Sequence, residues 1–434
     1  MLPNSVEAWL DHHTDEMVQT LSDLIAIPSV AGKASPGAPY GETCKTALDT
    51  YTTWTEQAGC TCTNYDNRCG AAEWNAEVEP YLGILFHLDV VSAEKEQWDS
   101  PPFEATVRDG RVYGRGAIDD KGPAVSALYA MKAIKASQIP LKRGVRFIFG
   151  TDEENGSSDI VYYRQHAKMP PHVFTPDGSY PVINLEKGML RINFHRILRD
   201  NPISCFHGGS IPNAIPAKAY AVADGGTVAY TGKEAHASTP EEGDNGITGL
   251  LEALTEHYPA SFWACLSRLF PHGETTGESL GLACRDAQSG ALTCALTVLH
   301  YDGETVNGTL DIRFPVSANK EEIICRITEA LTLLGCKTDV VLQMDPHYTP
   351  EESPFVQTLL HVYTEQTGET ARCLAIGGGT YVHDIDGGVA FGAERPGWDY
   401  HMHGANEFIP IDQLVDNAKL MAAAILALCG PDAK

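Results

Sequence analysis

Apolar side chains repeat at helical spacing over residues 6–27, and Pro28 ends the pattern. We therefore predict that the chain opens with one amphipathic helix. Further along, short apolar runs alternate with helical segments, which is the order typical of an α/β sheet. The predicted elements are strands at 81–88, 145–149 and 172–174 and a helix at 124–135.

The pattern changes near residue 187, where strands with alternating polar and apolar positions surround helices, and it reverts near residue 348. We predict a mixed-sheet α/β main domain formed by residues 1–186 and 346–434, with an α+β domain inserted at 187–345. The inserted elements are strands at 190–194 and 310–314 and helices at 247–257 and 321–334; the later main-domain elements are a helix at 354–367, a glycine turn at 377–379, a strand at 388–391 and a last helix.

Composition narrows the possible partners. The 57 acidic residues outnumber the 31 basic ones, and the net charge of -26 would repel phosphate backbones and anionic lipids. We expect neither a nucleic-acid nor a membrane partner, and the apolar run at 420–429 is too short to cross a bilayer. The acidic N-terminal segment has no signal-peptide pattern, and twelve scattered cysteines favour a reducing compartment over a disulfide framework. These features predict a cytoplasmic protein.

Acidic and histidine residues follow several of the predicted strands. His87 and Asp89 end the 81–88 strand and share one of its sides, so that the carboxylate could hold a metal-bound imidazole. Alone, this pair is more often a structural histidine. Asp119 and Asp120 come after a glycine-rich loop, where one acid could cap a helix and a second could bridge two metal ions.

Three more segments supply candidate ligands. Glu153 and Glu154 close the strand at 145–149; they could be a solvated acidic turn, or one could bind metal while the other takes a proton from water. Asp177 follows the strand at 172–174, and either His401 or His403 could be a ligand. Acids and imidazoles in this mixture suit zinc or manganese, with cobalt as a substitute.

Together these motifs resemble a known family. Phe86-His87-Leu88-Asp89-Val90-Val91, Gly114-Arg115-Gly116-Ala117-Ile118-Asp119-Asp120-Lys121-Gly122, Gly150-Thr151-Asp152-Glu153-Glu154 and His403-Gly404-Ala405-Asn406-Glu407 are similar to segments of the di-zinc metallopeptidases that include carboxypeptidase G, aminoacylase, carnosinase and PepV. The resemblance covers essentially the whole chain. It is strongest to the PepV-like dipeptidases, because Phe174-Thr175-Pro176-Asp177 and Glu186-Lys187-Gly188 also fit.

The resemblance implies a role for each candidate ligand. His87 and Asp177 would bind one ion, Glu154 and His403 the other, and Asp119 both. His403 is preferred because of its spacing to the following Asn-Glu pair, and His401 is held in reserve. Glu153 would be the general base, Asp89 would orient His87, and the Asp119–Asp120 peptide bond is expected to be cis.

The inserted domain would then be a lid that contacts substrate. By the same resemblance, His236 would stabilise the oxyanion. Asn213, Arg313 and Gly378 would bind substrate, with Arg313 suited to grip a terminal carboxylate through two parallel hydrogen bonds. His236 and Arg313 could instead be ordinary surface residues. Ser92 and Val382-His383 depart from the family pattern without touching a proposed ligand.

The resemblance predicts a zinc-peptidase fold that binds two divalent metal ions per chain. Zinc is the expected metal, and manganese and cobalt are the alternatives. The expected reaction is hydrolysis of dipeptides or very short peptides by a water held between the two ions. Deacylation of N-acyl amino acids, as by an aminoacylase or desuccinylase, is the alternative, and a catalytically inactive binding protein is a further one. The length of the inserted segment favours a monomer, with a dimer as the alternative.

Overall fold

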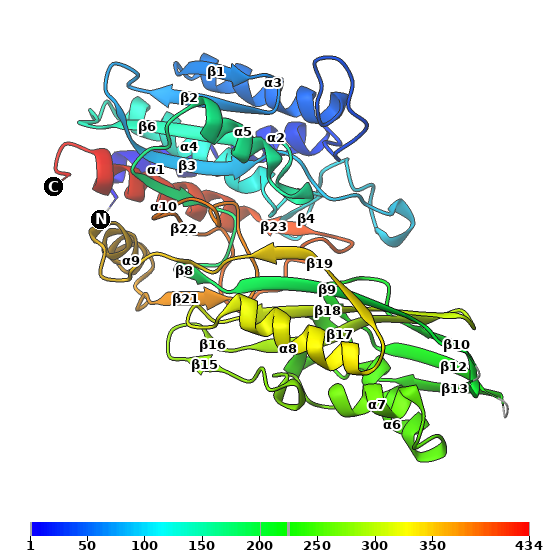
Figure 1. Cartoon of the computed structure of the whole chain (residues 1–434). Helices are drawn as coiled ribbons and strands as arrows, with labels where there is room; N and C mark the ends of the chain where they lie inside the picture. The colour runs from blue at the N-terminus through cyan, green and yellow to red at the C-terminus, as the bar shows by residue number, and fades with distance from the viewer. Residues whose placement is uncertain (1, 200, 224–225, 434) are drawn as a thin grey trace. The chain divides into compact units, whose positions relative to one another are not determined.

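The computed structural model describes residues 2–199, 201–223 and 226–433, which form two compact units. Unit 1 comprises Met1–Asn184, Thr349–Leu374 and Thr380–Lys434, and unit 2 comprises Leu185–Tyr348 and Ala375–Gly379. Figure 1 shows the elements of both units, coloured along the chain. The domain division predicted from the sequence, at 186/187 and 345/346, stays a prediction about separately folding domains.

Unit 1 is built on a mixed sheet in the order β1-β2-β6-β3-β7-β22-β8. Its central strands β6, β3, β7 and β22 pair in parallel, whereas β1, β2 and β8 join in antiparallel register. The predicted α/β class with a mixed sheet is thus confirmed. The strands are β1 (Thr61–Tyr65), β2 (Cys69–Trp74), β3 (Pro80–His87), β6 (Gly144–Gly150), β7 (His172–Thr175), β8 (Val182–Glu186) and β22 (Val389–Ala390).

Helices cover both faces of this sheet. Side chains of β3 alternate, so Ile84 and Phe86 join a core with α4 and α10, while Leu85 joins a second core with α5. By the same alternation, His87 points to the face of Leu85. The helices of unit 1 are α1 (Asn4–His12), α2 (Thr14–Ile25), α3 (Glu42–Gln57), α4 (Lys121–Ala136), α5 (Ser158–His166), α9 (Pro354–Thr367) and α10 (Ile411–Cys429).

The N-terminal segment differs from the prediction of one helix over residues 6–27. It forms two helices, α1 and α2, that are separated at His13. The His13 ring stacks on Trp9, with ring centroids 3.6 Å apart, and its Nδ1 lies 2.7 Å from the Trp9 carbonyl oxygen. This side-chain contact competes for a helix carbonyl and marks the break.

A small antiparallel sheet brings distant segments of unit 1 together. Its order is β23 (Phe408–Pro410), β5 (Arg111–Tyr113) and β4 (Thr106–Arg108). Because β23 pairs with β5, the residues just before β23 lie beside the loop that follows β5. This pairing had no clear signal in the sequence.

Unit 2 contains a seven-stranded antiparallel sheet in the order β13-β12-β10-β17-β18-β9-β19. One face packs on α6 (Gly246–His257), α7 (Phe262–Leu269) and α8 (Lys320–Leu333) in a core of its own. The strands are β9 (Gly188–Ile197), β10 (Ile203–Gly208), β12 (Lys218–Ala223), β13 (Gly226–Thr231), β17 (Thr293–Tyr301), β18 (Thr305–Phe314) and β19 (Lys337–Met344). Short strands complete the unit: β11 (Ala214–Ile215) with β14 (Ala235–His236), β15 (Arg285–Asp286) with β16 (Gly290–Ala291), β20 (His347–Tyr348) and, across the boundary, β21 (Cys373–Ile376).

Two glycines on β9 and β18 make room for aromatic rings of the opposite strand. Gly308 is paired with Phe194, and a Cβ on Gly308 would lie 2.2 Å from that ring; Gly188 and Phe314 have the same relation at 2.1 Å. Glycine is needed at both positions because any side chain would displace a core ring. The two pairs fix the register between these strands, and with it the position of every side chain on β18.

Two findings bear on the predicted environment. All twelve cysteines are free thiols. In the described part of the chain, no helix combines the length and the apolar composition needed to span a bilayer.

Candidate metal centre

The candidate ligands of unit 1 lie at the ends of strands or in the loops that follow them. His87 ends β3, Glu154 follows β6 and Asp177 follows β7, and these three strands run parallel. The carboxyl ends of parallel strands open at one edge of a sheet, where ligands bind in α/β folds. Asp119 comes from the loop before α4, and His403 from the loop before β23.

Asp119 lies between the two histidines. Its Oδ1 is 2.9 Å from His87 Nε2, and its Oδ2 is 2.8 Å from His403 Nε2. The carboxylate is buried, with 6% of its residue surface exposed. Each of its oxygens therefore faces a different imidazole, which is the arrangement required of a carboxylate that binds two ions.

The donor atoms fall into two groups that share Asp119. His87, Asp119 and Asp177 form one group, and Asp119, Glu154 and His403 form the other, with all donor atoms in a group within 4.8 Å of one another. In the first group His87 Nε2 is 4.0 Å from Asp177 Oδ2, and in the second His403 Nε2 is 3.2 Å from Glu154 Oε1. The structure thus brings together all five predicted ligands.

The residues present fit divalent metal ions. Each group offers one imidazole and two carboxylates, a donor set that suits hard or borderline divalent cations. Glu154 Oε1 is buried, and its close polar neighbour is His403 Nε2 of the same donor group, 3.2 Å away, as expected of two atoms that face one cation. Several carboxylates are buried close together, which is unfavourable without a compensating positive charge, and this also favours a bound cation.

The pKa values reflect the close spacing of these charged groups. Burial, followed by repulsion from Asp119, raises the pKa of Asp177 to about 7. Hydrogen bonds to Asp119 and then to Glu154 raise the pKa of His403 to about 11. Burial by itself would lower the pKa of His87, but its contacts with Asp119 and Asp89 hold that pKa well above the usual range. Bound cations would neutralise the charge of these carboxylates, so that the carboxylates would not need to be protonated.

Glu153 belongs to neither donor group. It is half-buried, directly before Glu154, in the short turn that closes β6. Burial, with repulsion from Asp177 and Glu154, raises its pKa well above the usual value for a glutamate. A carboxylate that has no ligand role and an elevated pKa is suited to accept and return a proton.

Asp89 contacts His87 mainly through its main chain, whereas the sequence had pointed to its carboxylate. His87 Nδ1 lies 3.0 Å from the backbone oxygen of Asp89 and 3.6 Å from its carboxylate. The carboxylate instead accepts hydrogen bonds from the backbone N–H groups of Glu153, at 3.2 Å, and Glu154, at 3.1 Å. Asp89 therefore holds the histidine with its main chain and the two glutamates with its side chain.

Glu407 and Arg115 hold the loop that carries Asp119, a role that sequence reasoning missed. The buried Glu407 carboxylate accepts from Arg115 Nη1 at 2.7 Å and from the backbone N–H of Asp119 at 3.3 Å. It also accepts from the N–H groups of Gly116 and Ile118. Arg115 Nη2 in turn donates to the carbonyl oxygen of His403 at 3.1 Å. One ion pair thus fixes the backbone of Asp119 and of His403.

The geometry bears on two smaller expectations. The Asp119–Asp120 peptide bond is cis, as expected. His401 is exposed, its Nδ1 lies 3.2 Å from the Ala405 carbonyl oxygen, and it belongs to neither donor group. The choice of His403 over His401, which chemistry alone had left open, thus agrees with the positions of the side chains.

In unit 2, two predicted substrate residues lie on adjacent segments. Strand β11 pairs with β14, and Ala237 N donates to the Asn213 carbonyl oxygen at 2.9 Å. His236, the last residue of β14, has its Nδ1 2.6 Å from Ser238 Oγ. Asn213 and His236 are therefore held on one two-stranded ribbon, and both residues are exposed.

Arg313 and Gly378 belong to the same part of unit 2. Arg313 Nη1 donates to the Gly377 carbonyl oxygen at 2.6 Å, and a Cβ on Gly377 would lie 2.7 Å from that of Ser238. The Arg313 side chain is buried, and Asp311 also accepts from its Nε at 2.5 Å. The sequence predicts that Arg313 grips a substrate carboxylate, and the structure shows a guanidinium whose orientation is already fixed by Asp311 and Gly377.

Known proteins share this sequence and fold. Residues 83–427 match the peptidase family M20/M25/M40. The chain is 34% identical to the putative dipeptidase YtjP of Bacillus subtilis (strain 168), over 95% of this chain and 97% of the relative. It is 30% identical to the Beta-Ala-Xaa dipeptidase of Lactobacillus delbrueckii subsp. lactis, over 95% and 96%.

Two solved structures share the fold at low sequence identity. Human carnosine dipeptidase 1 aligns with a TM-score of 0.67 and 18% identity, covering 98% of this chain and 99% of that one. The di-peptidase Dug1p from Saccharomyces cerevisiae aligns with a TM-score of 0.64 and 14% identity, covering 97% of both chains.

The contacts of Glu407 predict a loss of metal affinity when its charge is removed. In Glu407→Gln, Arg115 would remain buried without a charged partner, and the Asp119 loop would loosen. We expect affinity for zinc to fall by about 10–100-fold, the range for residues that orient metal ligands. Competition with a chromogenic chelator measures this. Glu73→Gln is the matched control, because it breaks another ion pair, that of Glu73 with Arg146 between β2 and β6, and it should keep the parental affinity for zinc. Equal zinc affinities in the parent and both variants would contradict the role of Glu407.

Proposed function

The chain belongs to peptidase family M20/M25/M40, and we propose that it is a metal-dependent dipeptidase that hydrolyses the peptide bond of dipeptides or very short peptides. The observation that carries the proposal is the position of Asp119, whose two oxygens face the imidazoles of two donor groups while Glu153 lies outside both. The names of the relatives, as dipeptidases, support the substrate class.

The proposed centre holds two divalent metal ions per chain. Zinc is the expected metal, and manganese and cobalt are the alternatives. His87 and Asp177 would hold one ion, Glu154 and His403 would hold the other, and Asp119 would offer one oxygen to each. When bound, such ions lower the pKa of a water molecule and polarise a carbonyl group. The oxygen-rich donor sets with one imidazole each support this choice of metals.

Glu153 is the proposed general base. It accepts a proton from the attacking water, and after the carbon–nitrogen bond breaks it gives that proton to the leaving amine. The hydrogen bonds from its own N–H and from that of Glu154 to Asp89 keep the two neighbouring carboxylates in separate roles. The elevated pKa of Glu153 supports the return of the proton to the amine.

Unit 2 supplies the proposed substrate contacts. His236 stabilises the oxyanion that forms on the substrate carbonyl, and Asn213 and Gly378 contact the substrate backbone. Arg313 binds the terminal carboxylate. Asp311 already accepts from its Nε and Nη2, and Gly377 from its Nη1, so the guanidinium is oriented in advance and a substrate carboxylate would have to reach its remaining N–H groups.

We further propose that the protein is a monomer in the cytoplasm. The length of the inserted segment, which PepV-like dipeptidases use to close the site within one chain, supports the monomer, and the twelve free thiols support a reducing compartment. Light scattering should give the mass of one chain, and cell fractionation should recover the activity with cytoplasmic markers. An obligate dimer in solution, or activity confined to another fraction, would contradict these assignments.

Separate substitutions of the adjacent glutamates test the division of roles. In Glu153→Gln, the donor groups are intact, so we expect both metals to be retained while kcat on a free dipeptide falls by about 10²–10⁴-fold, the share typical of a general base. In Glu154→Gln, we expect metal content itself to fall. Elemental analysis and steady-state kinetics measure both. A Glu153→Gln enzyme that retains parental kcat would exclude Glu153 as the base.

A substrate panel tests the reaction class. Metal-stripped protein, re-supplied separately with zinc, manganese and cobalt, is assayed on free dipeptides and on N-acetyl and N-succinyl amino acids. We expect hydrolysis of the dipeptides only after metal is added, and little hydrolysis of the acylated substrates. Preference for the acylated amino acids would favour the deacylase alternative, and full activity without metal would refute the metal centre.

A further inference from the structure

A row of polar side chains crosses the open face of the sheet in unit 2. Cα pairing places His207 opposite Tyr220 on one side and His300 on the other, and the row continues through Asn307 to His195. Directly paired residues of an antiparallel sheet point to the same face. Their chain neighbours Phe206, Leu299, Val306 and Phe194 belong to the core with the helices, so the row lies on the opposite face.

Within this row, two imidazoles are immediate neighbours. The ring centroids of His207 and His300 are 4.4 Å apart, with an angle of 64° between the ring planes. Opposite residues on paired strands have Cβ atoms about 4.5–5.5 Å apart, a spacing that allows two imidazoles to reach one ion. His195 is separated from His300 by the strand that carries Asn307, and so it has no such partner in the row.

The hydrogen bond of His300 orients it as a metal ligand. Its Nε2 lies 2.8 Å from the Gly209 carbonyl oxygen, which can only accept, so the proton is on Nε2 and Nδ1 carries a free electron pair. Histidines that bind metals usually donate their second nitrogen to a backbone carbonyl or a carboxylate in this way. Burial, and then the neighbouring His207, lower the pKa of His300, which favours the neutral form that a metal requires.

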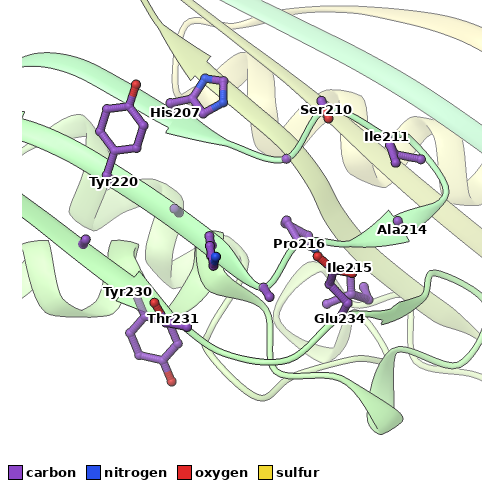
Figure 2. A pocket seen from close by; sticks show the side chains of 15 residues that line it. His207, Ser210, Ile211, Ala214, Ile215, Pro216, Tyr220, Tyr230, Thr231 and Glu234 are labelled. Atoms are coloured by element: carbon purple, nitrogen blue, oxygen red, sulfur yellow. The ribbon is translucent and has the colours of Figure 1, made fainter. Parts of the chain in front are cut away.

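His207 is accessible to a ligand from solvent. It is exposed, and among the described residues its ring has aromatic neighbours but no hydrogen-bond partner. It lines a cavity of about 560 Å³, seen in Figure 2 together with Tyr220 and the loop from Ser210 to Ala214. The cavity offers room for the water molecules that would complete the coordination of an ion.

We propose that His207 and His300 form a second metal site, which shares no residue with the centre around Asp119 and takes a transition-metal ion that prefers nitrogen ligands. The expected order of affinity is Cu²⁺ above Ni²⁺ and Zn²⁺. The carboxylate-rich centre in unit 1 suits harder cations, so the two sites differ in donor chemistry. The site also lies at the base of the loop that leads to Asn213, because Gly209 accepts the His300 hydrogen bond.

Copper binding to the zinc-loaded enzyme tests the site. Protein that carries two Zn²⁺ per chain, with excess zinc removed, is titrated with Cu²⁺, followed by electron paramagnetic resonance, while released zinc is measured. We expect one additional Cu²⁺ per chain, nitrogen hyperfine structure from two imidazoles, and no loss of zinc. His207→Asn and His300→Asn should each weaken Cu²⁺ binding on the order of 100-fold, since each removes one of two linked ligands.

His195→Asn is the matched control, because it removes an imidazole from the same row without touching the pair. It should bind Cu²⁺ as the parent does. The proposal is overturned if copper displaces zinc equally in all four proteins, if His195→Asn weakens binding as much as the other variants, or if the two-nitrogen spectrum persists in His207→Asn and His300→Asn. Because zinc retention and Cu²⁺ affinity are read directly, these outcomes do not depend on peptide hydrolysis.

Discussion

The candidate centre depends on one carboxylate that is shared by two imidazoles. Asp119 is buried, and its oxygens lie 2.9 Å from His87 and 2.8 Å from His403, residues that come from opposite ends of the chain. Burying several carboxylates together is unfavourable unless positive charge compensates them. The fold of unit 1 therefore brings several acids together in an arrangement that bound cations would stabilise. The remaining contacts of the site hold that arrangement in place.

Those contacts are made by groups that do not themselves belong to the donor sets. Glu407 binds the N–H of Asp119 and the side chain of Arg115, and Arg115 binds the carbonyl of His403. Asp89 does the equivalent for the other ligands, through its backbone to His87 and through its side chain to the Glu153–Glu154 turn. Two buried acids thus position the elements of both donor groups, each by hydrogen bonds to main chain.

Sequence reasoning reached the candidate ligands because their signals are local. An acid or a histidine directly after an apolar run is visible in a few residues, and the parallel strands β3, β6 and β7 then gather His87, Glu154 and Asp177 at one edge of the sheet. The Glu407–Arg115 pair could not be found in this way, because 292 positions separate its members and the β23–β5 pairing that joins them has no pattern of its own. The break at His13 was missed for another reason: a side chain there competes with the backbone for a carbonyl, which apolar spacing does not reveal.

The same distinction explains why Arg313 and the histidine row were not anticipated in their true environments. Sequence gives the residue type, but the partner of a residue on an antiparallel sheet is set by register: His207 meets His300 through the pairing of β10 with β17, and His300 meets Asn307 through that of β17 with β18. A shift by one position between β17 and β18 would move Asn307 out of the row that contains His300. Asp311 and Arg313 share one strand and keep their contact whatever the register, but the other partner of Arg313, the carbonyl oxygen of Gly377, lies 64 positions away in the chain. The nitrogen-rich site proposed for unit 2 therefore depends on strand alignment, whereas the candidate carboxylate-rich centre of unit 1 depends on loops that follow parallel strands. The carboxylate-rich centre can be inferred from local sequence motifs, whereas the histidine pair can be found only from the pairing of the strands.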